Sequence, residues 1–170
     1  MAGARHTAGA TRDGGALRDF EHSLPMALLR AREAAMGRFR PMLRSHGLTE
    51  QQWRVVRVLA EQPGIDAGSL AKRSYLLAPS LTRILQHLES RRLIRRDADE
   101  NDQRRSVFSL TGRGRRLFDA VAPDSELLYR AIEQEFGRRN LNALYRILTE
   151  FEQALETDAD PDCNARGNAA

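Results

Sequence analysis

The stretch from Asp66 to Leu110 constrains the fold of this chain more than any other part of the sequence. Asp66 can cap a short helix that ends near Arg73, and a turn follows over 74–78. Pro79 suits the first turn of a longer helix, whose apolar residues recur at three- and four-residue steps: Leu81, Ile84, Leu85 and Leu88. Two short strand-like segments come next, Leu93–Asp97 and Ser106–Leu110, joined by the polar tip 98–105. This order of elements predicts a winged helix-turn-helix.

Helical patterns flank this stretch on both sides. A helix is expected from Ser23 to Gly47, and a capping box of Thr49 and Gln52 opens another that stops at Pro63. After the hairpin, Thr111 caps a further helix that Gly137 ends, and we expect Pro123 to kink or interrupt it. A last helix carries a stripe of Leu141, Leu144, Tyr145, Leu148, Phe151 and Leu155. The fold class is therefore mainly α with a small β-hairpin wing.

The helix that begins near Pro79 leaves a polar face opposite its apolar stripe. That face holds candidate DNA-binding residues: Ser80, Thr82, Arg83, Gln86 and His87. Arg and Gln side chains can read guanine and adenine edges in a major groove, and hydroxyls near a helix N-terminus suit phosphate contact. An ordinary solvated helix face is the alternative, and the neighbouring hairpin argues against it.

The tip of the hairpin adds Arg104 and Arg105 to this candidate interface. Arg104 is placed to reach an adjacent minor groove, where a narrow width deepens the negative potential. Asp102, two residues earlier, is expected to hold Arg104 by a bidentate pair.

Charge is segregated along the chain. The net charge of the whole chain is +4 with a pI near 9.9. Residues 72–116 hold twelve basic and five acidic side chains, a net charge of +7, whereas 117–170 hold five basic and eleven acidic ones, a net charge of −6. This segregation indicates that one region faces a phosphate backbone while another does not.

Several classes of protein are disfavoured by the sequence. The one cysteine, Cys163, allows neither an internal disulfide nor a cysteine zinc site, and we expect no metal and no cofactor. No glycine-rich phosphate loop, metalloprotease motif or catalytic nucleophile is recognisable, so we expect no enzyme and no catalytic residues. No membrane span or secretory signal is visible, which predicts a cytoplasmic protein.

Motifs spread over roughly 24–156 resemble the MarR family of winged helix regulators. They are Leu48-Thr49-Glu50-Gln51-Gln52-Trp53, Ser80-Leu81-Thr82-Arg83-Ile84-Leu85, Leu88-Glu89, and Asp102-Gln103-Arg104 through Ser109-Leu110-Thr111. The segment from Ala31 to Trp53 is most similar to the branch that represses operons for degrading hydroxylated aromatic acids such as homoprotocatechuate. The chain departs from the family at Arg92, where the family often has Gly, and at Pro79.

The resemblance implies a homodimer in which terminal helices intertwine. It divides the chain into a flexible arm at 1–22, a helical dimerisation region at 23–47 and 111–156, a DNA-binding winged domain at 48–110, and a flexible tail at 157–170. Recognition helices of a two-fold dimer would then lie about 34 Å apart, which matches a palindromic operator. The expected function is a DNA-binding regulator, most simply a repressor.

Regulators of this family often bind small aromatic acids, here a hydroxyphenylacetate- or hydroxynicotinate-like catabolite. The candidate ligand-binding residues are Arg32, Arg40, His46 and Arg54 for a carboxylate, and Phe39, Trp53 and Tyr75 for an aromatic ring. Each also has a structural alternative, since Trp53 suits a core and a lone Arg is often solvated or paired. A carboxylate ligand should favour the dimer spacing that binds DNA less well.

One alternative from another class remains open. The same fold can serve as a protein-interaction module or as a ligand sensor without direct DNA binding. Arg83, Gln86, His87 and Arg104 distinguish the two, because a DNA-free module has no need of them on one surface.

Overall fold

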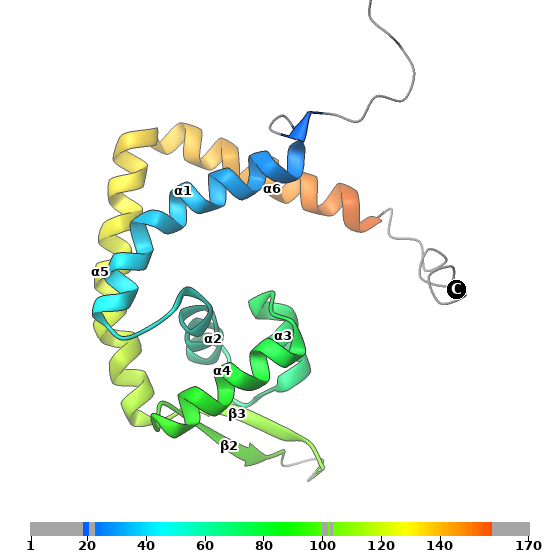
Figure 1. Cartoon of the computed structure of the whole chain (residues 1–170), viewed down its shortest axis with the longest axis vertical. Coiled ribbons are helices and arrows are strands. Elements are labelled where there is room, and N and C mark those ends of the chain that lie inside the picture. Colours follow the sequence, from blue (N-terminus) through cyan, green and yellow to red (C-terminus); the bar gives the residue numbers. More distant parts are fainter. Residues whose placement is uncertain (1–18, 21–22, 100–101, 103, 158–170) are drawn as a thin grey trace, which may run out of the picture. The chain divides into compact units, whose positions relative to one another are not determined.

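A computed structural model describes residues 19–20, 23–99, 102 and 104–157. Its elements are α1 (Leu24–Ser45), α2 (Glu50–Glu61), β1 (Ile65–Asp66), α3 (Ala67–Ser74), α4 (Ala78–Ser90), β2 (Ile94–Ala98), β3 (Ser106–Leu110), α5 (Gly112–Phe136) and α6 (Arg138–Thr157). The described residues are mainly helical with one small sheet, as the sequence predicts (Figure 1). The predicted arm at 1–22 and tail at 157–170 lie almost wholly outside these residues.

Three helices begin at the side-chain caps that the sequence predicts. Thr49 and Gln52 form a reciprocal capping box on α2. Asp66 accepts a hydrogen bond from the Ser69 backbone N–H at the start of α3, and Thr111 accepts one from Gly114 at the start of α5. Each cap satisfies a backbone donor that the first helical turn leaves without a partner.

The sheet has three antiparallel strands in the order β1-β3-β2. The hairpin register pairs Ile94 with Leu110 and Ala98 with Ser106. The two-residue β1 was not predicted from the sequence, and it pairs Ile65 with Phe108. It anchors the hairpin at the start of α3, so the wing and the helix-turn-helix share one sheet.

The chain falls into two compact units, one ending at Gly37 and one beginning at Arg38, so α1 contributes to both. In the second unit, the core is built from apolar residues of α2, α3, α4, the sheet and α5. Its most deeply buried members include Val55, Val56, Leu59, Leu70, Leu81, Leu88 and Val121. All four residues of the predicted stripe on α4 are buried, which confirms the face assigned to that helix.

The sequence predicts that Pro123 kinks or interrupts this helix. Helix α5 is continuous from Gly112 to Phe136, so Pro123 does not interrupt it. Val121 and Ser125, on either side of the proline, are both buried. Packing on both sides therefore holds the helix across the one position that lacks a backbone N–H. At its other end, Gly114 lies directly against the carbonyl of Leu93, which leaves no space for a side chain.

Helix α6 follows α5 after Gly137, whose φ of +89° is a conformation that favours glycine. No side chain from 138 to 156 is buried, although α6 is amphipathic. Leu144, Tyr145, Ile147 and Leu155 are between 40% and 56% exposed. Among the described helices, none is both long and apolar enough to cross a membrane.

Candidate nucleic-acid interface

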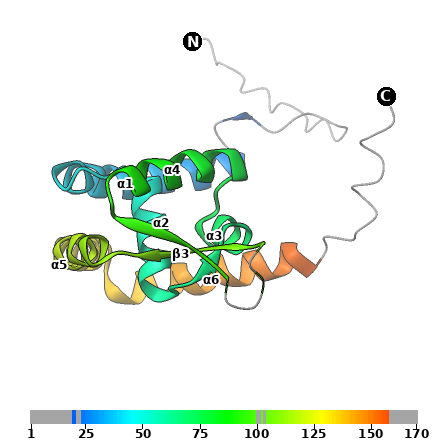
Figure 2. The ribbon, with the colours of Figure 1, turned by 90° about the horizontal axis from the view of Figure 1, so that it is seen from below.

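Helix α4 and the wing lie on the same face of the second unit. Viewed from below, α4 and the β2-β3 hairpin stand together on the near side (Figure 2). A groove of about 440 Å³ separates them, lined on one side by Thr82, Gln86 and Glu89 and on the other by Arg96, Arg104 and Arg105. The structure therefore brings the two predicted halves of the interface together.

The predicted face of α4 points outward. Thr82, Arg83, Gln86 and His87 are exposed, and Ser80 is half-buried. The Thr82 hydroxyl donates to the Ala78 carbonyl on the same helix, at 3.0 Å. The His87 ring is held from α2, because its Nδ1 lies 3.0 Å from Nε2 of Gln52. Sequence reasoning did not find this contact, which joins residues 35 positions apart.

The two arginines of the wing differ in their partners. Arg105 lies 3.5 Å from Asp66, the residue that caps α3. Arg104 is exposed, and its guanidinium makes no ion pair within the described part of the chain. The predicted bidentate pair is not present, since Asp102 instead accepts the backbone N–H of Arg104 at 3.1 Å and so shapes the turn. The Arg104 guanidinium is thereby left available at the wing tip.

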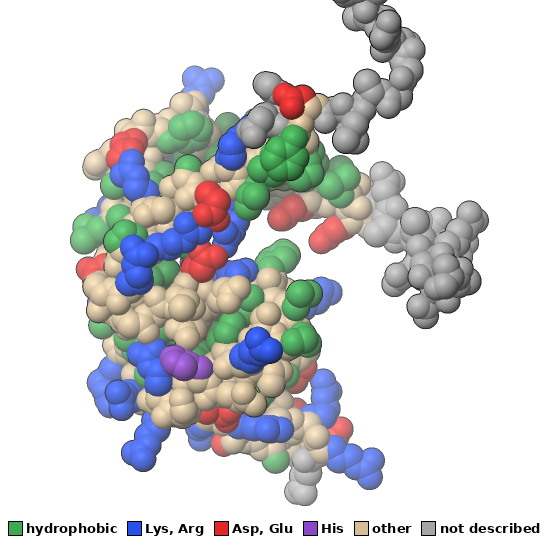
Figure 3. Space-filling model, viewed as in Figure 1, with side chains coloured by type: hydrophobic (Ala, Val, Ile, Leu, Met, Phe, Trp, Pro, Cys, Tyr) green, Lys and Arg blue, Asp and Glu red, His purple; other side chains and the backbone are tan. Residues whose placement is uncertain are grey.

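Basic side chains gather along this face. Figure 3 shows Lys and Arg at both ends of its lower edge, over the start of α5 and over the wing. The arginines that line the groove are Arg96, Arg104 and Arg105. Further exposed arginines lie on β2 and at the start of α5: Arg95, Arg113 and Arg116. This placement agrees with the net charge of +7 over 72–116 and suits a polyanionic partner.

The capping contacts of Ser69 lower the pKa of the Asp66 carboxyl, and the nearby Arg105 lowers it further. A carboxyl whose pKa is lower in the folded state stabilises the fold above its unfolded pKa of about 3.9, and this stabilisation is lost as the pH falls through the folded value. In Asp66→Asn the cap can be kept while the charge is removed. We expect the wild type to be more stable than this variant at pH 7, by less than about 1 kcal/mol, with the difference shrinking below about pH 4.

Urea unfolding at pH 7, 5 and 3 measures this difference. An equal difference in the free energy of unfolding at all three pH values would contradict a stabilising role for the charge of Asp66.

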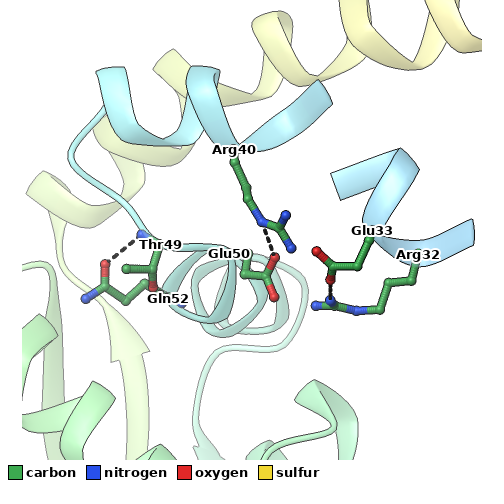
Figure 4. A network of polar contacts seen from close by, with 6 residues as sticks. All are labelled: Arg32, Glu33, Arg40, Thr49, Glu50 and Gln52. Atoms are coloured by element: carbon green, nitrogen blue, oxygen red, sulfur yellow. Dashed lines mark hydrogen bonds and ion pairs between the residues drawn. The ribbon is translucent and has the colours of Figure 1, made fainter. Parts of the chain in front are cut away.

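The predicted carboxylate partners each have a polar contact within the chain. Arg32 pairs with Glu33 on its own helix, and Arg40 pairs with Glu50 at 3.2 Å (Figure 4). His46 lies 2.9 Å from Asp124. Arg54 donates to the Ser74 carbonyl at 2.8 Å, and its Nε is buried without a partner. Tyr75 follows α3 in a left-handed conformation and is 80% exposed.

Two of the three aromatic candidates, Phe39 and Trp53, pack against rings of α5. Phe39 lies 4.9 Å from the Tyr129 ring, and Trp53 stacks on Phe118 at 5.6 Å, both measured between centroids. Trp53 is 7% exposed, so it is chiefly a core residue.

Arg57, which sequence reasoning missed, contacts one of these rings, Tyr129. Its guanidinium donates to the Tyr129 hydroxyl at 3.4 Å, a long bond, and this is its one polar contact within the described residues. A pocket of about 220 Å³ is lined by Arg54, Arg57, Val58, Glu61 and Arg73. The position of Arg57 one helical turn after Trp53 was the available signal. Among the described side chains, no group of three or more His, Cys, Asp or Glu is placed to hold a metal ion.

Comparisons with known proteins agree with this arrangement. A family model described as "MarR family" matches residues 48–106. The homoprotocatechuate degradative operon repressor of Escherichia coli is 47% identical over 129 residues, which span 76% of this chain and 87% of the relative.

Two solved structures are also similar. NadR in complex with 4-hydroxyphenylacetate has a TM-score of 0.72 at 35% identity, covering 79% of this chain and 98% of that one. The repressor CouR bound to a 23-mer DNA duplex has a TM-score of 0.71 at 26% identity, covering 81% and 99%.

Proposed function

Because the chain belongs to the MarR family of transcriptional regulators, we propose that it is a repressor that binds a palindromic operator as a homodimer and is released by a small aromatic acid. The proposal keeps the division predicted from the sequence, with 48–110 binding DNA and with 23–47 and 111–156 forming the dimer. It places the protein in the cytoplasm, where the operator is.

One observation carries the proposal: α4 and the wing present polar and basic side chains on a single face while the opposite side of α4 is buried. The proposed DNA contacts are Ser80, Thr82, Arg83, Gln86, His87, Arg104 and Arg105. Arg83 and Gln86 would read base edges in the major groove, and Arg104 would reach the neighbouring minor groove. The similarity to CouR on a DNA duplex supports this assignment.

The exposed apolar side chains of α6 support a homodimer. A helix that presents Leu144, Ile147 and Leu155 to water without burying any side chain needs a partner surface. A second copy supplies that surface under two-fold symmetry and also sets the spacing between the two α4 helices.

For the effector, Arg57 is the best-placed carboxylate partner in the second unit. Arg40, Arg54 and His46 already contact Glu50, the Ser74 carbonyl and Asp124, whereas Arg57 has only its long bond to Tyr129. The Tyr129 ring of α5, which Arg57 contacts, packs against Phe39 of α1. The names of the Escherichia coli relative and of the NadR complex support a hydroxylated aromatic acid as the ligand.

Operator binding tests the function against the alternative of a DNA-free module. We expect Arg83→Ala to weaken binding to the upstream region of the gene by about 10- to 100-fold, the effect of losing one bidentate base contact. Fluorescence anisotropy with a labelled duplex measures the affinity. The matched control is Arg139→Ala, an exposed arginine of α6 whose loss should leave binding unchanged.

Salt separates the two functions further. Wild-type affinity should fall at least about tenfold between 50 and 200 mM salt, because released counterions drive binding at phosphates. An affinity that is indifferent to salt, or equal losses in the two arginine variants, would favour the interaction module.

Removal of the Arg57 guanidinium should abolish effector binding. At a concentration about 100-fold above its Kd, 4-hydroxyphenylacetate should raise the Tm of the wild type by about 5–10 °C. Arg57→Ala should show less than about 1 °C of this shift, while Arg130→Ala, an exposed arginine of α5, should keep it. Thermal-shift measurements with and without the acid check this, and a full shift in Arg57→Ala would exclude Arg57 as the partner.

A further inference from the structure

The contact between Gln52 on α2 and His87 on α4 has a defined hydrogen-bond donor and a defined acceptor. Within the capping box, Oε1 of Gln52 accepts the Thr49 backbone N–H at 3.0 Å, and the Thr49 hydroxyl accepts the Gln52 backbone N–H at 3.2 Å. Nε2 of the same amide lies 3.0 Å from Nδ1 of His87. One side chain therefore caps α2 and holds a residue of α4.

The capping box fixes which end of the amide faces the histidine. A backbone N–H can only donate, so the atom next to Thr49 must be the amide oxygen. The amide nitrogen that remains for His87 has protons to give and no lone pair to accept with. Nδ1 of His87 must therefore accept the hydrogen bond and carry no proton of its own.

This arrangement selects one tautomer of His87. A neutral imidazole has a single proton, and with Nδ1 acting as acceptor that proton lies on Nε2. His87 is exposed on the polar face of α4, beside Arg83 and Gln86. The ring therefore offers the solvent side of α4 one N–H donor and no ring nitrogen acceptor.

We propose that Gln52 is a positioning residue that sets His87 as an Nε2–H donor toward an acceptor atom on DNA. This inference rests on the proposed function. The acceptor is a purine N7, guanine O6, thymine O4 or phosphate oxygen. The amino groups of cytosine and adenine would require the opposite tautomer, with Nε2 as acceptor. Gln52 thus contributes to specificity without contacting DNA.

The substitution Gln52→Glu keeps the cap but replaces the hydrogen-bond donor that faces Nδ1 of His87 by an acceptor. A glutamate at this position still accepts the Thr49 N–H, as in the usual capping box, but its carboxylate offers His87 only an acceptor. Nδ1 should then carry a proton. Gln51→Glu is the matched control, since it adds the same charge at the exposed neighbouring position of α2.

The tautomer is read first in the DNA-free protein, by long-range ¹H–¹⁵N correlation of the histidine rings. We expect His87 of the wild type and of Gln51→Glu to show a proton on Nε2 alone, and Gln52→Glu to show a protonated Nδ1. A wild-type ring protonated on Nδ1, or identical ring spectra in all three proteins, would overturn the inference whatever the protein does with DNA.

Operator affinity is read second, in a double-mutant cycle. Gln52→Glu should weaken binding about tenfold more than Gln51→Glu, and the extra loss should fall below about twofold in a His87→Ala background. Duplexes with 7-deazapurines remove the purine N7 acceptor, and methylphosphonate linkages remove a phosphate oxygen. The loss of affinity caused by Gln52→Glu should disappear only on the duplex that lacks the acceptor of His87.

The two failures are distinguishable. Expected ring spectra with equal affinities of Gln52→Glu and Gln51→Glu would overturn the contact with DNA and leave the proposed function intact. A wild type that binds no operator at all would overturn the proposed function and the DNA contact together, while the spectra would still decide what Gln52 does to His87.

Discussion

Replacing Gly114 by alanine should destabilise the protein by about 3 kcal/mol or more, because the added methyl group meets backbone that cannot move aside. A Cβ at this position would lie 1.9 Å from the Leu93 carbonyl oxygen and 3.3 Å from the Leu110 side chain. The carbonyl also accepts hydrogen bonds from the backbone N–H and the hydroxyl of Thr111. Relief of the clash would require α5 to move away from the hairpin.

Thermal unfolding followed by circular dichroism measures the effect, which corresponds to a Tm lower by about 6–12 °C or more. Gly112→Ala is the matched control, since its Cβ would meet nothing closer than the flexible end of Arg116 at 3.6 Å. That substitution should change stability by less than about 1 kcal/mol. A Tm for Gly114→Ala within 2 °C of the control would show that α5 is not packed against Leu93 in solution.

The second large effect is expected from a charge in the apolar stripe of α6. Leu144→Glu places a carboxylate among side chains that a second copy of the chain would cover, and burying an unpaired charge is costly. The dimer should dissociate, with operator affinity lower by about 100-fold or more, because two half-sites no longer bind as one unit.

Sedimentation together with operator titration checks this result. The mass should fall to that of one chain, 19.2 kDa, for Leu144→Glu and stay at twice that value for Asn142→Glu, which lies on the polar face of α6. Circular dichroism separates dissociation from unfolding. A folded Leu144→Glu protein that keeps the dimer mass would show that the dimer interface does not include this face of α6.

The elements that the sequence predicts correctly depend on local contacts. The caps at Thr49, Asp66 and Thr111 all act on backbone groups three residues away. The buried stripe of α4 follows from helical periodicity alone. The family preference for glycine at Arg92 also has a local cause, since Arg92 has a φ of +56°, in the left-handed region where glycine is at no disadvantage.

What the sequence misses depends on partners far along the chain. The pairing of β1 joins Ile65 to Phe108, and the continuity of α5 through Pro123 depends on the burial of Val121 and Ser125. The shared face of α4 and the wing was predicted in outline, whereas the contacts of the candidate ligand residues were not. Periodicity cannot tell that Arg54 faces the Ser74 carbonyl while Arg57 faces Tyr129, because that choice is made by α3 and α5.

The continuity of α5 has a mechanical consequence. Its 25 residues form one continuous helix about 37 Å long, with one end packed against the hairpin at Leu93 and the other leading into α6 (Figure 1). A tilt of roughly 5° at the α6 end would displace the hairpin end by about 3 Å over that length. In the proposed dimer, a change of this size would alter the spacing of the two recognition helices. A small ligand that changed the angle of α5 would therefore change the fit on the proposed operator.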